Sequence, residues 1–171
     1  MDQFEAAPAG QWAIYVPKSL IRNKVWNVIK ERCGGYSLYG DNLDQKISKR
    51  NDRDPANGSY AISVRAVVEA DEENAGKSTN QLDGEGHRGM TFLERELLEL
   101  AFFLTTGEHL DHENLTLCPA SRDVDGRVPC MFWYPDFGKV QVHSCGVGSS
   151  GSHIRSRSVR VLPAKQRASV A

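Results

Sequence analysis

The first pattern along the chain is a strand followed directly by an amphipathic helix. Residues 12–16 are rich in aromatic and β-branched side chains and end before a proline, which predicts a strand. Between residues 19 and 32, apolar side chains recur at the spacing of a helix. These apolar positions are Ile21, Val25, Val28 and Ile29. Gly34 and Gly35 then end the helix, because glycine readily adopts the left-handed conformation that follows many helices.

A second helix, which begins at Thr91, is the clearest element in the chain. Thr91 and Glu94 have the spacing of a capping box, in which the hydroxyl accepts from the amide of residue 94 and the glutamate reaches back to the cap. Apolar residues then form one stripe that we expect to face the core. These residues are Leu93, Leu97, Leu100, Ala101 and Leu104. Gly107 is placed to end the helix.

From residue 114 onward the chain changes to short segments typical of strands and turns. Alternating or β-branched runs predict strands over residues 128–134, 139–143 and 154–162. Asp125-Gly126, which lies before the first of them, is typical of a tight turn. Strand and helix at the start, a helix in the middle and several strands at the end favour an α+β fold.

The section between the two helices is the hardest to interpret. Residues 40–58 and 74–89 are polar and resemble loops, while residues 59–68 fit a strand or a helix almost equally well. We expect one domain over residues 1–162, and a flexible tail over residues 163–171.

The composition is sufficient for a hydrophobic core, but the net charge is too small to attract a charged partner. Of the 171 residues, 40% are hydrophobic and 25% are charged, as in ordinary globular domains. The net charge of -1 gives no reason to expect binding to nucleic acid or to an acidic membrane. The chain shows neither a secretory signal nor an apolar run long enough to cross a bilayer. A cytoplasmic protein is therefore the default expectation, with surface display only through a partner.

Cysteine and histidine spacing gives no support for a metal or a cofactor. None of the four cysteines forms a CxxC pair, so we expect free thiols, with Cys33 packed as a small apolar side chain at a helix end. His109 and His112 are three residues apart beside acidic residues, but without a further fixed ligand this spacing is weak evidence for a metal site.

Several short motifs in the second half of the chain belong together. They are Leu117-Cys-Pro-Ala-Ser-Arg122, Asp125-Gly126, Val128-Pro129, Trp133 and Ile154-Arg-Ser-Arg-Ser-Val159. This segment resembles the framework of the variable proteins of diversity-generating retroelements. The helix before it, and Glu108-His-Leu-Asp111, are similar to what often precedes such a framework in proteins of uncultured, small-genome microbes.

The resemblance implies both a fold and a function. The fold would be C-type lectin-like, with two helices packed on small antiparallel sheets and with long irregular loops. The variable region would lie at about residues 122–153, where mutated adenines turn AAC codons into NNC codons. The protein would then not be an enzyme. It would bind an unknown protein or other macromolecule through a hypervariable surface, and would need no cofactor.

The resemblance also indicates which positions would contact the ligand. They are Asp123, Val124, Cys130, Phe132, Tyr134, Phe137, His143, Ser144, Cys145, Gly148, Ser149 and Gly151. Cys130, Phe132 and Tyr134 alternate, so on a strand they share one face, with Trp133 on the opposite face toward the core. Aromatic rings supply contact area at low entropic cost, and small polar residues supply adaptable contacts.

Two other functions use the same residues. Formylglycine-generating and related oxidases share the C-type lectin fold and use paired cysteines, and Cys130 and Cys145 would lie on neighbouring strands. A zinc-stabilised domain would instead use Cys118, Cys130, His143 and Cys145, although their spacing matches no zinc module.

Structural explanations also exist for these segments. Residues 132–134 fit the core of a small sheet, and residues 146–152 fit a flexible linker. Arg155, Arg157 and Arg160 fit a phosphate-binding stripe, but a solvated edge or pairing with the acidic helix around residues 94–99 is the more common role of such arginines.

Overall fold

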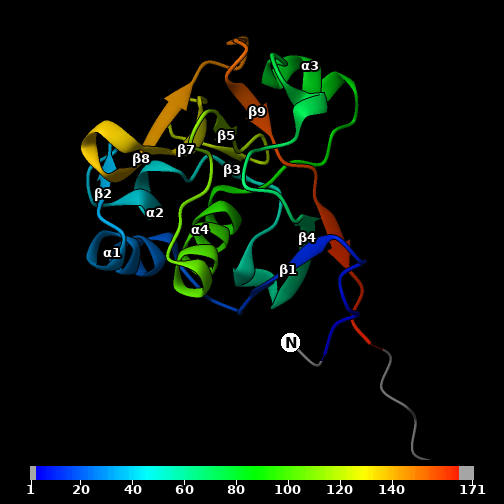
Figure 1. The fold of residues 1–171 in the computed structure, drawn as a ribbon. Helices are drawn as coiled ribbons and strands as arrows, with labels where there is room; N and C mark the ends of the chain where they lie inside the picture. The colour runs from blue at the N-terminus through cyan, green and yellow to red at the C-terminus, as the bar shows by residue number, and fades with distance from the viewer. Residues whose placement is uncertain (1–2, 166–171) are drawn as a thin grey trace, which may run out of the picture.

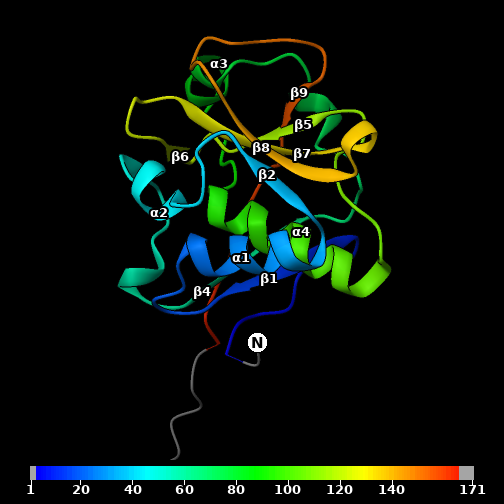
Figure 2. The same cartoon turned by 90° about the vertical axis from the view of Figure 1, so that its left-hand side faces the viewer.

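Two sheets enclose the two long helices of the chain (Figure 1). The computed structural model describes residues 3–165. Helices α1 (Arg22–Arg32) and α4 (Phe92–Thr106) lie between a three-stranded sheet and a five-stranded sheet, as Figure 2 shows. The main apolar core fills this space, with Trp26, Ile29 and Phe92 almost fully buried. The fold is therefore α+β, as expected.

The smaller of these two sheets joins the beginning and the end of the chain. Its antiparallel strands, in spatial order, are β1 (Gln11–Val16), β4 (Tyr60–Arg65) and β10 (Arg160–Leu162). Beyond the sheet, Ala164 pairs with Phe4, and the amide of Lys165 donates to the carbonyl of Gln3. Residues 163–165, where a flexible tail was expected to begin, are thus paired with the N-terminal segment, and residues 166–171 lie outside the described part.

The five-stranded sheet is mixed, whereas small antiparallel sheets were expected. Its strands, in spatial order, are β2 (Gly35–Ser37), β8 (Lys139–Cys145), β7 (Val128–Tyr134), β5 (Leu115–Leu117) and β9 (Ile154–Ser156). The three central strands are antiparallel, while β2 pairs parallel to β8 and β9 pairs parallel to β5. Long crossovers through other elements separate both parallel pairs in the sequence, as parallel pairing requires.

Short elements occupy the section that the sequence left open. They are α2 (Leu43–Lys46), η1 (Pro55–Asn57), η2 (Glu72–Asn74) and α3 (Thr79–Gly84), with η3 (Pro135–Phe137) later in the chain. Two further strands, β3 (Arg50–Asn51) and β6 (Ser121–Arg122), form a separate antiparallel pair. Residues 60–65 form a strand, so the helical alternative for this segment is wrong.

Both ends of α4 follow the sequence prediction. The Thr91 hydroxyl accepts from the amide of Glu94 at 3.3 Å, and the Glu94 carboxylate accepts from the amide of Thr91 at 2.8 Å. Gly107 ends the helix with a φ of 77°. These contacts confirm the capping box and the glycine cap.

The expected apolar stripe of α4 is confirmed only in part: Leu93, Leu97 and Leu100 contact the main core, whereas Ala101 and Leu104 are exposed. The first half of the helix is enclosed nearly all round, so Glu94, Arg95, Glu96 and Glu99 are fully buried beside its apolar residues. The other end emerges from the core, and Leu104 is 63% exposed. A single stripe assumes burial on one face, whereas this helix passes between two sheets.

The predicted strand over residues 154–162 is divided between the two sheets. Between β9 and β10 the chain is held by contacts to other segments, because buried Arg157 donates to the carbonyls of Val67 and Val68 at 2.8 and 2.6 Å. The amide of Ser158 donates to Asp71 at 2.7 Å.

Among residues 3–165, no helix combines the length and the apolar character that crossing a membrane requires.

Candidate ligand-binding site

The two faces of strands β7 and β8 have different roles. Met131, Val140 and Val142 are fully buried in the core beneath the five-stranded sheet. The register pairs Cys130 with His143, so these side chains belong to the opposite, outer face. The same register places Phe132 opposite Gln141, and Tyr134 opposite Lys139, on that outer face. The alternation inferred from the sequence therefore assigns the side chains of these two strands to the correct faces.

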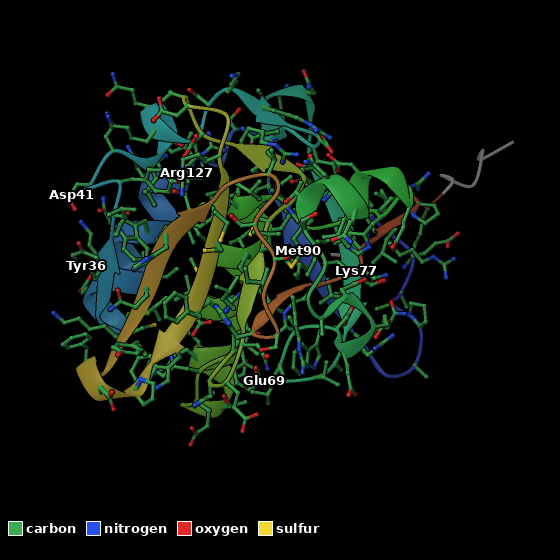
Figure 3. All side chains as sticks on the ribbon, turned by 90° about the horizontal axis from the view of Figure 1, so that it is seen from above. Tyr36, Asp41, Glu69, Lys77, Met90 and Arg127 are labelled. Carbon is green, nitrogen blue, oxygen red and sulfur yellow. The ribbon has the colours of Figure 1, made fainter. Side chains whose placement is uncertain are left out.

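One half of the outer face is covered. Helix α3 and the segment after β8 lie over it, and a second apolar cluster fills the space below. The buried members of this cluster are Leu82, Leu117, Val128, Cys130 and Ile154. Figure 3, which looks down on the sheet, shows Tyr36 on the side away from this cover. The uncovered half is therefore the part made by β2 and by the β7–β8 hairpin.

A continuous row of rings occupies the uncovered half. We call Tyr36, His143, Phe132, Tyr134 and Phe137 the aromatic surface. Ring centroids along this row are 6.3 Å apart for Tyr36 and His143, 5.5 Å for His143 and Phe132, 6.3 Å for Phe132 and Tyr134, and 5.0 Å for Tyr134 and Phe137. Tyr36 is 49% exposed, Tyr134 37% and Phe137 69%. Large side chains thus remain open to solvent beside one another.

Two hollows flank this row. The larger, of about 450 Å³, lies between the β7–β8 hairpin and residues 112–115. Its lining includes Phe132, Tyr134, His143, Cys145, His112 and His153. The smaller, of about 310 Å³, is lined by Tyr36, Phe137, Lys139 and Gln141. Burial lowers the pKa of His143 below its ordinary value of 6.5, so its ring is neutral at pH 7.

Seven of the expected contact residues line these hollows, and the sequence missed several others. Cys130, Phe132, Tyr134, His143, Ser144 and Cys145 line the larger hollow, and Phe137 lines the smaller one. Tyr36, Lys139 and Gln141 were not predicted as contacts. Tyr36 belongs to a three-residue strand that begins at the second glycine of the pair and is too short to give a periodic signal. Lys139 and Gln141, in contrast, alternate with His143, so the sequence pattern could have identified them.

The expectation that Cys130 is exposed is wrong. Its side chain is fully buried within the second apolar cluster, because Leu117 of the neighbouring strand and the cover from α3 close over it. Its sulfur lies 3.9 Å from that of Cys145, which is only partly buried. The sequence thus placed the two thiols on neighbouring strands correctly. The burial of Cys130 depends on the covering segments, which the alternation along a strand does not show.

The expectation that Asp123 is a surface contact is also wrong. Its side chain is 2% exposed and closes the turn that precedes β7. The carboxylate accepts from the amides of Asp125 and Arg127 at 3.0 and 2.8 Å, and from the Tyr39 hydroxyl at 2.9 Å. Val124, in contrast, is 47% exposed, at a separate hollow away from the aromatic surface.

Residues 146–151 do not join the aromatic surface either. The carbonyl of Val147 accepts from the amide of Asn80 at 3.0 Å, so this loop is attached to α3. Gly148 and Ser149 are exposed on its outer side, and Gly151 is half-buried. This segment is therefore not a free linker, and none of these three residues lines the two hollows beside the aromatic surface.

A buried ionic network supports the inner side of the site. Arg95 donates to Glu99 at 2.8 Å and to Asp111 at 2.8 Å, and Arg157 donates to Asp111 at 2.7 Å. All four side chains are at most 1% exposed. Arg157 is therefore a structural arginine rather than part of a phosphate-binding stripe, and its acidic partner lies in the loop after α4 rather than in the helix.

The metal alternatives lack a suitable set of side chains. Within the described range, no three histidine, cysteine or acidic side chains lie together as metal ligands. His109 instead lies with its Nδ1 2.9 Å from the Glu99 carboxylate. Of the proposed zinc set, Cys118 lies in the main core, whereas Cys130 belongs to the second cluster.

Comparison with known proteins leaves the site to be interpreted from its own geometry. No protein-family model, no curated protein and no solved structure matches this chain.

Proposed function

We propose that this protein is a non-enzymatic binding protein that holds a macromolecular ligand against the aromatic surface. The observation that carries the proposal is the unbroken row of five rings, three of them more than one-third exposed, between two hollows. Exposed apolar groups gathered in one place favour an interaction site. Rigid rings with polar neighbours such as Gln141 and Lys139 suit contact with a protein, because they combine buried area with hydrogen bonding.

The division between buried frame and open side chains supports the retroelement part of this proposal. Framework residues Leu117, Val128 and Ile154 are buried, while Tyr134 and Phe137 between them are exposed. Side chains of the second kind can be exchanged without removing core contacts. The contact set we propose is Tyr36, Phe132, Tyr134, Phe137, His143 and Ser144, which leaves out Asp123 and Cys130 because both are buried.

The arrangement of the elements supports a C-type lectin-like scaffold. The first and last strands of the described chain share one sheet, two helices pack against it, and the C-terminal third builds most of a second sheet. A scaffold closed by its own ends holds the second sheet and its loops on a fixed base.

A pair of codon libraries tests the proposal. One library carries NNC codons at Phe132, Tyr134 and Phe137, and the control library carries them at Met131, Val140 and Val142 on the buried face. We expect most members of the first library to fold, and selection against unrelated target proteins to yield binders. Most members of the control library should fail to fold. If the two libraries tolerate substitution equally poorly, the outer face is structural and the proposal is wrong.

The DNA beside the gene gives an independent test of diversification. A near-copy of the segment encoding residues 122–159, differing at adenines and lying near a reverse-transcriptase gene, is the expected finding. A gene neighbourhood without either feature would leave a binding protein of fixed sequence.

A further inference from the structure

Two of the four thiols lie together at the edge of the larger hollow. Cys130 and Cys145 come from adjacent strands, β7 and β8, and their sulfurs are 3.9 Å apart. Both cysteines line the same hollow. Cys130 is fully buried, whereas Cys145 is partly exposed. A small molecule that enters the hollow therefore meets Cys145 first, with Cys130 directly behind it.

The surroundings of Cys145 favour its thiolate. The two sulfurs are close enough for a hydrogen bond in which either can be the donor. When the more buried Cys130 keeps its proton, this contact and the positive charge of Arg127 lower the pKa of Cys145 from 9.0 to about 7 despite partial burial. The same contact and burial raise the Cys130 pKa. An accessible thiolate beside a protonated thiol is the arrangement found in thiol–disulfide exchange, with one attacking and one resolving sulfur.

The other two thiols have neither feature. Cys33 is buried at the end of α1, and burial raises its pKa to about 11. Cys118 is fully buried in the main core, and burial raises its pKa as well. They therefore serve as internal controls for reactivity within the same molecule.

We propose that Cys145 and Cys130 form a dithiol that exchanges stoichiometrically with small disulfides in this hollow. The Cys145 thiolate attacks one sulfur of the small disulfide, a mixed disulfide forms, and the first half leaves as a thiolate. Cys130 then loses its proton to solvent and attacks the Cys145 sulfur, which releases the second half as a thiolate. The small disulfide is reduced to two thiols, and the protein is oxidised to a Cys130–Cys145 disulfide.

The proposal does not depend on what the aromatic surface binds. Closure requires the sulfurs to move from 3.9 Å to the bonded distance of about 2.05 Å. Cys130 faces His143 rather than Cys145 across the strand pair, so the bridge is diagonal.

The test uses the folded full chain and the aromatic disulfide dithiobis(nitrobenzoate). We expect a fast phase that releases two equivalents of nitrothiobenzoate, followed by a protein whose mass shows the loss of two hydrogens and no adduct. Reaction of Cys145 should be at least about tenfold faster than that of Cys33 or Cys118. Peptide mapping should place the new bond between Cys130 and Cys145.

Matched serine variants assign the two roles. Cys130→Ser should keep the fast phase but release one equivalent and retain one adduct on Cys145. Cys145→Ser should lose the fast phase, while Cys118→Ser and Cys33→Ser should keep it. Phenylarsine oxide, which requires two neighbouring thiols, should block the fast phase of the unaltered chain, so the test does not depend on a variant that folds. A stable single adduct on the unaltered chain, or equal reaction of all four thiols, would overturn the proposal.

Discussion

The imidazole of His109 lies flat against the indole of Trp133, with ring centroids 3.6 Å apart and planes 5° from parallel. Phe103 of α4 covers the other side of the imidazole, at 4.9 Å between centroids. Glu99 holds the ring at 2.9 Å from its Nδ1. Trp133 thereby fixes the inner side of β7 to the end of α4, while its neighbours Phe132 and Tyr134 face outward.

Replacing Trp133 with alanine should destabilise the fold strongly. The change removes the stack on His109 and opens a space beside the imidazole, so we expect the free energy of unfolding to fall by about 3 kcal/mol. Urea unfolding followed by circular dichroism measures the loss. Trp133→Phe keeps a flat ring against the imidazole, and it should cost less than half as much. Equal losses for both variants would show that the stack contributes little.

Replacing Tyr134 or Phe137 with alanine should leave stability nearly unchanged. Both rings contact the other rings of the aromatic surface, yet they are 37% and 69% exposed. We expect each variant to stay within about 0.5 kcal/mol of the unaltered chain, because exposed contact residues add little to the core. The midpoint of thermal unfolding measures this. A loss of several kcal/mol at either position would assign these rings to the core and count against a binding role.

The hydrophobic pattern of the sequence was sufficient to place the strands of the site, but it did not show how deeply their side chains are buried. Strands β7 and β8 alternate inward and outward residues, and this short-range signal put Phe132 and Tyr134 on the correct face. The burial of Cys130 depends instead on α3, about fifty residues earlier in the chain, and on Leu117. Such a cover leaves no trace in the periodicity of the strand it covers.

Charged residues in the core were the second thing that the sequence concealed. Arg95 and Glu99 in the middle of α4 fit a solvated helix face by pattern alone, yet both are fully buried. Their burial becomes favourable only because Asp111 and Arg157 complete the network from distant segments. The second sheet likewise combines strands whose parallel pairing no local rule predicts.

Removing the Asp111 carboxylate should be among the most destabilising changes in the chain. It accepts from Arg95 and Arg157, and its loss leaves two buried guanidinium groups without their shared anion. For Asp111→Ala we expect a loss on the order of 3–5 kcal/mol. Asp111→Asn keeps one acceptor and tolerates the left-handed backbone at this position, where φ is 58°, so it should lose less. Urea midpoints of the two variants provide the measurement, and a loss below about 1 kcal/mol for alanine would contradict the role of the network.

Glu96 gives the fold a dependence on pH. Its side chain is fully buried in α4, and neither carboxylate oxygen has a hydrogen-bond partner among residues 3–165. Burial raises the pKa of Glu96 well above its ordinary value of 4.5, with Arg22 opposing this and Asp44 adding to it. The folded protein therefore keeps a proton that the unfolded chain releases as the pH rises above 4.5.

The sign of the effect follows from this difference in bound protons. Above pH 4.5 the unfolded chain binds fewer protons at this position than the folded protein, so stability falls as pH rises, by up to about 1.4 kcal/mol per unit until the raised pKa is passed. Glu96→Gln removes the titration. We expect it to match the unaltered chain near pH 4 and to exceed it in stability at pH 7, measured by urea unfolding across that range. Glu108→Gln, at an exposed glutamate just after the same helix, should leave the pH profile unchanged. Parallel profiles for Glu96→Gln and the unaltered chain would mean that Glu96 is ionised in the folded protein, and would contradict the prediction.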